Sequence, residues 1–287
     1  MPHPPALVAS ISGLREHLAA RRTLGPVGFV PTMGALHEGH ATLIRGARKG
    51  NATVVVSIFV NPLQFDRQED LARYPRTLEA DAALCETLGV DVVFAPTAAE
   101  MYPEPLMMGV TVGRLGDHLC GPSRPGHFAG VATVVLKLLQ IVQPDRAYFG
   151  EKDAQQLAII RRLVTDFNLP VTIVGMPTIR EADGLAMSSR NRRLSPEGRR
   201  AALALVRALT ATTRAIVEGV ADAVAARAAG QREVREDDAV RLEYLEIVDP
   251  ATLQPVDQVR GPVLVAGALW ADGVRLIDNM PASPGPH

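Results

Sequence analysis

The chain has 287 residues, of which 47% are apolar and 21% charged, a balance typical of a globular protein with a sizeable core. Its formal net charge of −1 argues against a broad basic surface for nucleic acid, and its two cysteines, Cys85 and Cys120, exclude a disulfide framework. No run approaches ~18 uninterrupted apolar residues, and the N-terminus lacks the pattern of a signal peptide. We therefore expect a cytoplasmic protein that neither spans a membrane nor binds nucleic acid.

The first 175 or so residues alternate short β-rich runs with helical patterns. The run at 53–60 is apolar except for Thr53 and Ser57, which suits a central strand buried on both faces. This alternation predicts a parallel sheet wrapped by helices, a Rossmann-like doubly wound α/β domain over residues 1–177. The expected strands are 27–30, 53–60, 91–96, 146–149 and 170–175, and the expected helices are 37–49, 78–89, 130–143 and 154–167.

The pattern changes after residue 177. Asp183-Gly184 lies between two extended arms, which is a hairpin signal. Ser195-Pro196-Glu197 combines an N-cap, a proline at the first helical position and an early acid, and so predicts a helix that runs to about Gly219. A second, Ala-rich helix should follow. We predict a smaller α+β C-terminal domain over 178–287, with strands at 242–249, 262–270 and 274–279.

Ligands of an open parallel sheet bind beyond the carboxyl ends of its strands, in the loops that lead into helices. Three segments with polar side chains fall there, and a fourth follows the domain boundary. None contains the GxxxxGK[ST] or GxGxxG signature of the common phosphate-binding loops. The four segments are PTMGALHEGH (31–40), NPLQFD (61–66), GEKDAQQ (150–156) and MSSRN (187–191).

His37 and His40 are three residues apart, which places them on one face of the first turn of a predicted helix. Free backbone N–H groups and the helix dipole attract anions there and favour neutral imidazoles that donate N–H bonds. The spacing alone fits two exposed histidines without a ligand equally well. Zinc is the weaker alternative, because no third ligand has a recognisable spacing.

The other segments are ambiguous when each is taken alone. Lys152 is one of only three lysines and could bind a phosphate, with Asp153 as a helix cap, but EKD is also a plausible solvated turn. The hydroxyls and guanidinium of MSSRN could hydrogen-bond to phosphoryl oxygens, but the segment could equally be a surface turn. The amides of Asn61 and Gln64 could bind the hydroxyl or carboxylate groups of a ligand, or they could simply cap the loop in which they lie. RPGHF adds Arg124 and His127 before a helix.

Together these motifs resemble the pantothenate synthetase family, the ATP-dependent pantoate–β-alanine ligases of the HxGH nucleotidyltransferase superfamily. HxGH alone is shared by many nucleotidyltransferases, whereas its combination with VNPLQF, RPGHF and GEKDxQQ is highly specific. The resemblance covers nearly the whole chain, through PTMGALHEGH, SIFVNPLQFD, LARYPRTLEAD, SRPGHFAGVATVV, FGEKDAQQ, GLAMSSRN and RLIDN in the order of the family. The main departure is Cys120, where relatives often carry an acidic residue.

This resemblance implies a two-step reaction, in which pantoate attacks the α-phosphorus of ATP and β-alanine then displaces AMP from the pantoyl adenylate. The implied catalytic residues are His37, His40, Lys152 and Arg190. The implied ATP-binding residues are Met33, Gly34, His37, His40, Gly150, Lys152, Asp153, Ile179, Met187, Ser188, Ser189 and Arg190. The residues implied for pantoate and β-alanine are Asn61, Gln64, Arg124 and Gln156.

The resemblance also implies Mg²⁺ held mainly by phosphates and water rather than by a protein cage, and a homodimer built through the N-terminal domain. Because adenylation removes no proton from a carboxylate, we expect the histidines to stabilise charge at the phosphates instead of transferring a proton.

Two alternatives remain at this point. One is an HxGH adenylyltransferase that joins AMP to a phosphate ester and stops there. The other is a synthetase-like RNA-binding module without activity, which the near-neutral charge disfavours.

Overall fold

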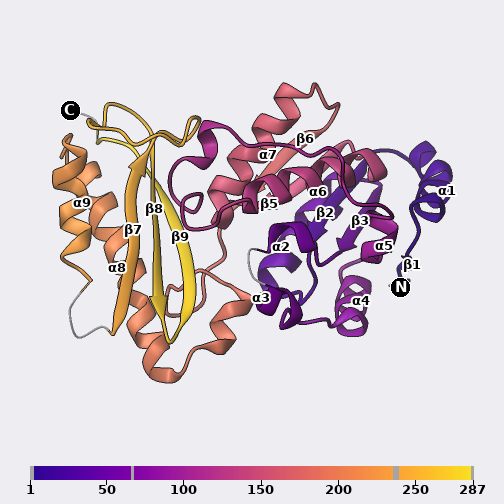
Figure 1. Ribbon diagram of the computed structural model, residues 1–287, viewed down its shortest axis with the longest axis horizontal. Coiled ribbons are helices and arrows are strands. Elements are labelled where there is room, and N and C mark those ends of the chain that lie inside the picture. The colour runs from indigo at the N-terminus through magenta and orange to yellow at the C-terminus, as the bar shows by residue number, and fades with distance from the viewer. Residues whose placement is uncertain (1–2, 66–67, 235–238, 286–287) are drawn as a thin grey trace. The chain divides into compact units, whose positions relative to one another are not determined.

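The computed structural model describes residues 3–65, 68–234 and 239–285 (Figure 1). The chain forms two compact units. Unit 1 comprises Met1–Val112, Arg124–Glu151 and Ile159–Pro177, and unit 2 comprises Gly113–Ser123, Lys152–Ala158 and Thr178–His287. None of the helices in the described ranges combines the length and apolar character that crossing a membrane requires.

Unit 1 is built on a six-stranded, fully parallel sheet, which confirms the α/β prediction. The order across the sheet is β1-β4-β3-β2-β5-β6. The predicted central strand is β3, and all of its residues except the last are buried. The strands are β1 (Ala6–Val8), β2 (Val27–Thr32), β3 (Thr53–Ile58), β4 (Val92–Phe94), β5 (Arg146–Gly150) and β6 (Thr172–Met176).

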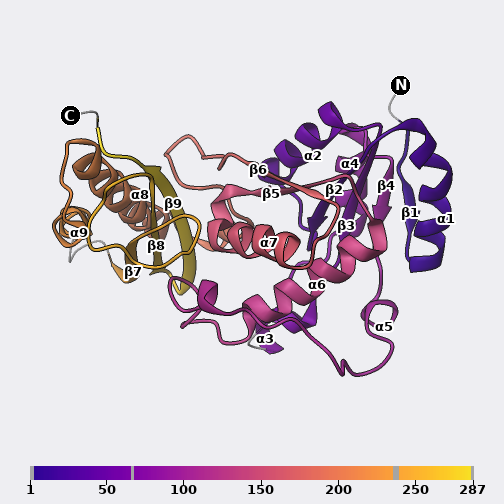
Figure 2. The ribbon, with the colours of Figure 1, turned by 90° about the horizontal axis from the view of Figure 1, so that it is seen from above.

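Helices cover both faces of this sheet, with α2 and α4 on one side and α6 on the other (Figure 2). Sequence patterns missed the first two elements, β1 and the helix α1, which buries only Leu14 and Leu18. Helix α7 starts in unit 2 and continues into unit 1. The helices are α1 (Ile11–Arg21), α2 (Glu38–Gly50), α3 (Gln68–Ala72), α4 (Leu78–Thr87), α5 (Ala98–Met101), α6 (His127–Val142) and α7 (Ala154–Asp166).

The strand order creates a topological switch point between β2 and β5. From β2 the chain proceeds through β3 to β4 in one direction, and it then crosses back to place β5 on the other side of β2. Loops at the carboxyl ends of such a strand pair diverge and leave room for a ligand. Here these loops contain residues 33–37, after β2, and the chain that follows Gly150.

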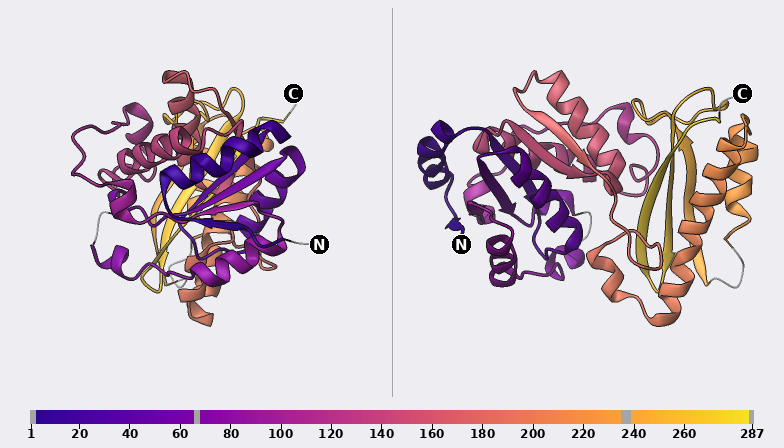
Figure 3. Two further views of the ribbon diagram at one scale, coloured as in Figure 1. Left: turned by 90° about the vertical axis from the view of Figure 1, so that its right-hand side faces the viewer. Right: turned by 180° about the vertical axis from the view of Figure 1, so that it is seen from behind.

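Unit 2 contains a three-stranded antiparallel sheet, β7-β8-β9, with two helices packed against it (Figure 3). Ser195 caps α8 as predicted, and its hydroxyl accepts the N–H of Gly198 at 3.0 Å. Asp272 and Gly273 have φ of 50° and 69°, the left-handed conformation that a tight β8–β9 turn requires. The elements are α8 (Pro196–Val217), α9 (Ala223–Gln231), β7 (Val240–Val248), β8 (Val263–Ala271) and β9 (Val274–Ala282).

The predicted hairpin at 178–189 forms only in part. Its arms make one isolated bridge, between Arg180 and Ala186, and they add no strand to a sheet. Gly184, with φ of 93°, makes the turn. The chain then enters a short 3₁₀ helix, η5 (Ser189–Arg193), which Ser188 caps.

Candidate active site

His37 and His40 form the start of α2. The Nδ1 atom of His37 accepts the N–H of Gly39 at 3.1 Å, and Nδ1 of His40 accepts the N–H of His37 at 3.3 Å. A ring nitrogen that accepts a backbone N–H carries no proton, so the neutral form of each ring carries its proton on Nε2. A Cβ atom at Gly39 would lie 2.9 Å from Cε1 of His37, which explains the glycine of HxGH.

The loop that leads to His37 is held by a buried carboxylate. Gly34 and Ala35 have φ of 82° and 51°, a left-handed turn that needs external support. Asp81, which is 3% exposed, accepts the N–H of Ala35 at 2.9 Å and that of Leu36 at 2.8 Å. Asp81 is the last residue of the motif LARYPRTLEAD, but the sequence alone did not indicate its role, since 45 residues separate it from Leu36.

Asn61 is buried and its amide is fully used. Its Oδ1 atom accepts the N–H of Leu63 at 3.3 Å and the hydroxyl of Tyr102 at 2.9 Å. Its Nδ2 atom donates to Oε1 of Gln64 at 3.1 Å and to the carbonyl of Gly130 at 3.2 Å. Burial raises the pKa of Tyr102 to about 12, so its phenol stays a donor at neutral pH. Asn61 thus holds the half-buried Gln64, whose Nε2 lies 3.0 Å from Sδ of Met33.

RPGHF contacts the same loop. Nδ1 of His127 lies 2.8 Å from the backbone oxygen of Gln64, and Nε2 lies 2.9 Å from Nη1 of Arg124. A carbonyl only accepts and a guanidinium only donates, so His127 is the neutral Nδ1–H tautomer. This tautomer is the opposite of that in His37 and His40. Unit 1 therefore brings Arg124, Asn61, Gln64 and Met33 into one hydrogen-bonded group.

Gly130 allows α6 to approach this loop. A Cβ atom there would lie 2.2 Å from the carbonyl oxygen of Leu63 and 2.9 Å from the backbone nitrogen of Gln64. These are backbone atoms, which cannot move aside as a flexible side chain could. Glycine at position 130 therefore lets α6 and this loop pack without a clash against the backbone.

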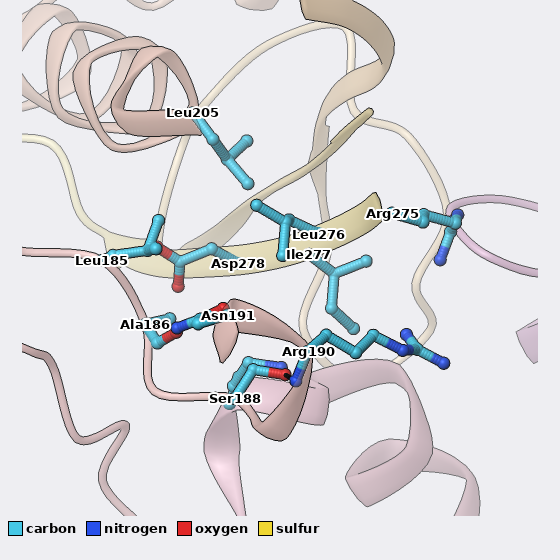
Figure 4. Close-up of a pocket in the computed structure, with 11 residues that line it drawn as sticks. Leu185, Ala186, Ser188, Arg190, Asn191, Leu205, Arg275, Leu276, Ile277 and Asp278 are labelled. Carbon is cyan, nitrogen blue, oxygen red and sulfur yellow. Dashed lines mark hydrogen bonds between the residues drawn. The ribbon is translucent and has the colours of Figure 1, made fainter. Parts of the chain in front are cut away.

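In unit 2, Lys152 is among the residues that line one pocket. Figure 4 labels four of the others, Ser188, Arg190, Arg275 and Asp278. Arg275 forms an ion pair with Glu243, and Asp278 forms one with Arg180. No ion pair within the described ranges involves Lys152 or Arg190. The pocket therefore contains two cationic side chains whose charge is not neutralised by a carboxylate.

The two adjacent glutamines of GEKDAQQ have different surroundings. Gln155 is buried, and it accepts the N–H of Cys120 at 2.9 Å and donates to the carbonyls of Leu115 and His118 at 2.8 and 2.9 Å. Gln156 is half-buried. Gln155 therefore anchors the 113–123 segment, whereas Gln156 is the one of the pair with exposed surface for a ligand.

The remaining predicted residues have the following places. Gly150 ends β5, next to β2 at the switch point, and Asp153 is exposed in the 3₁₀ helix η4 (Glu151–Asp153). The N–H of Met187 donates to the carbonyl of Ile179 at 2.9 Å, across the partial hairpin. Ser189 is half-buried in η5.

Arg275 lies between Glu243 and Cys120. Its Nη2 lies 2.7 Å from Oε1 of Glu243 and 3.5 Å from Sγ of Cys120. The Arg275 hydrogen bonds, aided by those of Ser123 and Trp270, lower the pKa of Glu243 to about 2.

No cluster of three or more His, Cys, Asp or Glu side chains that could hold a metal occurs in the described ranges. The zinc alternative for His37 and His40 is therefore not supported by any third ligand among these residues.

Comparison with known proteins supports the same interpretation. A family model described as Pantoate-beta-alanine ligase matches residues 6–281. A pantothenate synthetase of Moorella thermoacetica is 52% identical over 275 residues, which are 96% of this chain and 97% of that protein. A bifunctional pantoate ligase/cytidylate kinase of Thermosynechococcus vestitus is 55% identical over 275 residues, which are 95% of this chain but only 54% of that longer protein.

Solved structures agree with these matches. A pantothenate synthetase from Thermus thermophilus has a TM-score of 0.90 at 49% identity, covering 96% of this chain and 98% of that one. A pantoate-beta-alanine ligase from Francisella tularensis, solved with beta-gamma ATP and beta-alanine, has a TM-score of 0.78 at 35% identity and covers 96% and 97%. With its motifs, its fold and these matches over nearly its full length, the chain belongs to the pantoate–β-alanine ligase family.

Proposed function

We propose that this chain carries out the reaction of its family, the ATP-dependent condensation of pantoate with β-alanine through a pantoyl adenylate. The observation that carries the proposal is the kind of side chain that each unit contributes. Unit 1 offers neutral, hydrogen-bonded imidazoles and amides, and unit 2 offers Lys152 and Arg190 without neutralising carboxylates. Such a set suits charge stabilisation at phosphates better than nucleophilic attack by the protein.

In the first step, a carboxylate oxygen of pantoate attacks the α-phosphorus of ATP, and the bond to the β-phosphate oxygen breaks. No proton moves, and the charge of the transition state lies on phosphoryl oxygens. Lys152 and Arg190 would balance this charge, and the Nε2–H groups of His37 and His40 would donate hydrogen bonds to it. Pyrophosphate leaves, and pantoyl adenylate remains bound.

In the second step, the β-alanine amine attacks the acyl carbon, the bond from this carbon to the AMP oxygen breaks, and the amine proton passes to solvent as AMP leaves, which gives the amide of pantothenate. Gln64, held by Asn61 and with Arg124 beside it, would bind the hydroxyls and carboxyl of pantoate together with Gln156. Adenylation makes this attack possible because AMP is a far better leaving group than an oxide ion.

Mg²⁺ bound to the triphosphate would screen its charge. We assign its ligands mainly to phosphate oxygens and water, as is usual for Mg²⁺ bound to a nucleotide. Met33, Gly34, Gly150, Asp153, Ile179, Met187, Ser188 and Ser189 complete the proposed ATP site. A homodimer and a cytoplasmic location are proposed with the same function, and analytical ultracentrifugation would test the first.

An AMP assay on the purified protein tests the function. ATP, pantoate and β-alanine together should yield AMP, pyrophosphate and pantothenate in equal amounts. Omission of β-alanine should leave only a stoichiometric burst of pyrophosphate with enzyme-bound pantoyl adenylate. An adenylyltransferase would instead form no acyl adenylate, and salt-sensitive tRNA binding without ATP turnover would favour the RNA-binding alternative.

A further inference from the structure

The RLIDN segment has no part in the function proposed above, although it includes two deeply buried polar side chains. Asp278 and Asn279, both on β9, are 4% and 8% exposed. Buried carboxylates and amides require hydrogen-bonding partners, and the identity of those partners indicates what the residues hold in place.

Asn279 binds the backbone of Lys152. Its Nδ2 atom donates to the Lys152 carbonyl oxygen at 2.8 Å. Since a carbonyl can only accept, this contact fixes which end of the amide faces Lys152. Lys152 lies in the short helix η4, whose own hydrogen bonds are too few to define its position. The bond to Asn279 therefore fixes the backbone from which the Lys152 side chain extends.

Asp278 holds the second cation-bearing segment. Its carboxylate accepts two bonds from the Arg180 guanidinium, at 2.7 and 3.1 Å. Nη1 of Arg180 also donates to the carbonyl of Gly184 at 3.0 Å, across the turn. Arg180 thus closes the partial hairpin from which the chain continues directly into Ser188 and Arg190.

The two contacts are themselves linked, because the N–H of Asn279 donates to Oδ1 of Asp278 at 2.8 Å. Adjacent positions on one strand therefore hold two segments that are more than 25 residues apart in the sequence. Each segment carries a cation that lines the same pocket of unit 2. Phosphoryl transfer is sensitive to such placement, since an error of ~1 Å can cost ~10²-fold in rate.

We propose that Asn279 is a positioning residue for Lys152, and that Asp278 is a positioning residue for the segment with Ser188 and Arg190. The pair sets where the two phosphate-binding cations stand relative to each other. The inference rests on the proposed function for the identity of the ligand, ATP.

The test is the isosteric variant Asn279→Asp, which replaces the donor to the Lys152 carbonyl with an acceptor. We expect pantoate-dependent pyrophosphate release at saturating ATP to fall by ~10- to 100-fold, with the KM for pantoate nearly unchanged. Thr212→Val is the matched control, because it removes another buried hydrogen bond of unit 2, 2.9 Å long, in the middle of α8. It should keep the wild-type rate.

A double-mutant cycle separates positioning from general destabilisation. If Asn279 acts through Lys152, Asn279→Asp should change the rate by less than ~2-fold in a Lys152→Ala background. A full multiplicative loss in that background, a wild-type rate for Asn279→Asp, or an equal loss in Thr212→Val would overturn the proposal. Asp278→Asn combined with Arg190→Ala tests the second contact with the same logic.

ATP affinity, measured by calorimetry without pantoate, distinguishes failure of the proposed function from failure of the positioning role. A wild-type protein that binds ATP but forms no pantothenate would refute the proposed function. The cycle would then be scored on ATP affinity: non-additive losses for Asn279→Asp and Lys152→Ala would support positioning, and additive losses would refute it.

Discussion

The two units hold their candidate site residues in different ways. In unit 1, Asn61, Gln64, Arg124 and His127 bind one another, so each side chain has a fixed orientation and the imidazole is neutral. In unit 2, the side chains of Lys152 and Arg190 form no ion pair with any described residue, although the backbones that carry them are anchored. The polar side chains of this group in unit 1 therefore have defined orientations, whereas unit 2 leaves two cationic side chains without an ion pair to a described residue.

This difference has an energetic reason. Amide and hydroxyl recognition depends on the angle of each hydrogen bond, so the recognising groups must be held from behind before the ligand arrives. A cation that meets a triphosphate acts mainly through its charge, and a neighbouring carboxylate would cancel that charge. Fixing the backbone while leaving the cationic end unpaired satisfies both needs. Removal of groups from the two units should therefore have different consequences.

The largest effect is expected for Lys152→Ala. The variant should lose at least ~10²-fold in pantoate-dependent pyrophosphate release, as is typical when one electrostatic stabiliser is removed. Its thermal unfolding should stay close to that of the wild type, since no described ion pair is broken. Lys49→Ala, at an exposed position of α2, is the matched control. Wild-type pyrophosphate release by Lys152→Ala would remove this lysine from the mechanism.

A smaller effect is expected for Gly130→Ala, which forces a methyl group against the backbone of Leu63. Overpacking of this kind costs about 1–3 kcal/mol. Because the strain falls on the loop that holds Gln64, pantoate affinity should fall more than ATP affinity. Urea unfolding measures the loss of stability, and substrate titrations measure the change in pantoate and ATP affinity. Gly261→Ala, where an added Cβ meets no atom within 4 Å, should be neutral.

Gln64→Ala should raise the KM for pantoate by about tenfold, the cost of roughly one net hydrogen bond. The KM for ATP should change little. Steady-state kinetics with each substrate varied in turn would measure both. If ATP binding suffered and pantoate binding did not, the assignment of the two sites would be reversed.

The smallest effect is expected for Glu243→Gln, and it depends on pH. The folded-state pKa of Glu243 is about 2, below its ordinary value of 4.5, so its pairing with Arg275 stabilises the fold above pH 4.5 and is lost as the pH falls toward 2. At pH 7 the variant should be less stable by about 1 kcal/mol. Urea titrations should show this difference shrinking below pH 4.5. A constant difference from pH 7 to 3 would exclude the ion pair as its cause.

Much of the fold could be predicted because its signals are local. The apolar run of β3, the Ser195-Pro196 start of α8 and the Asp272-Gly273 turn each depend on neighbours in sequence. Helix α1 was missed because only Leu14 and Leu18 are buried, too few to make a clear apolar stripe. The hairpin at 178–189 has a correct turn, but Arg180 turns to β9 and no further strand pairing develops.

The site was less predictable because its supports are distant in sequence. Chemistry-bearing motifs pointed to Gln64, His37 and Lys152, but nothing local indicates that Asp81 holds the loop before His37 or that Asn279 holds Lys152. Asn61 differs from Asp81 and Asn279, because the sequence did draw attention to it. Its residue type suggested a ligand contact, and the structure has its amide fully occupied by protein partners.

The reciprocal bonds between the two imidazoles and the backbone at the start of α2 have a consequence for engineering. A substitution in this segment changes the cap of α2 and a proposed phosphate-binding side chain at the same time. A library screened for turnover alone would therefore not distinguish variants with a destabilised helix from variants that have lost a catalytic group. Asparagine at position 37 preserves the terminus and removes only the imidazole. Alanine at position 37 removes both the cap and the imidazole. Stability lost by the alanine variant but kept by the asparagine variant measures the cap, and activity lost by both measures the contribution of the ring.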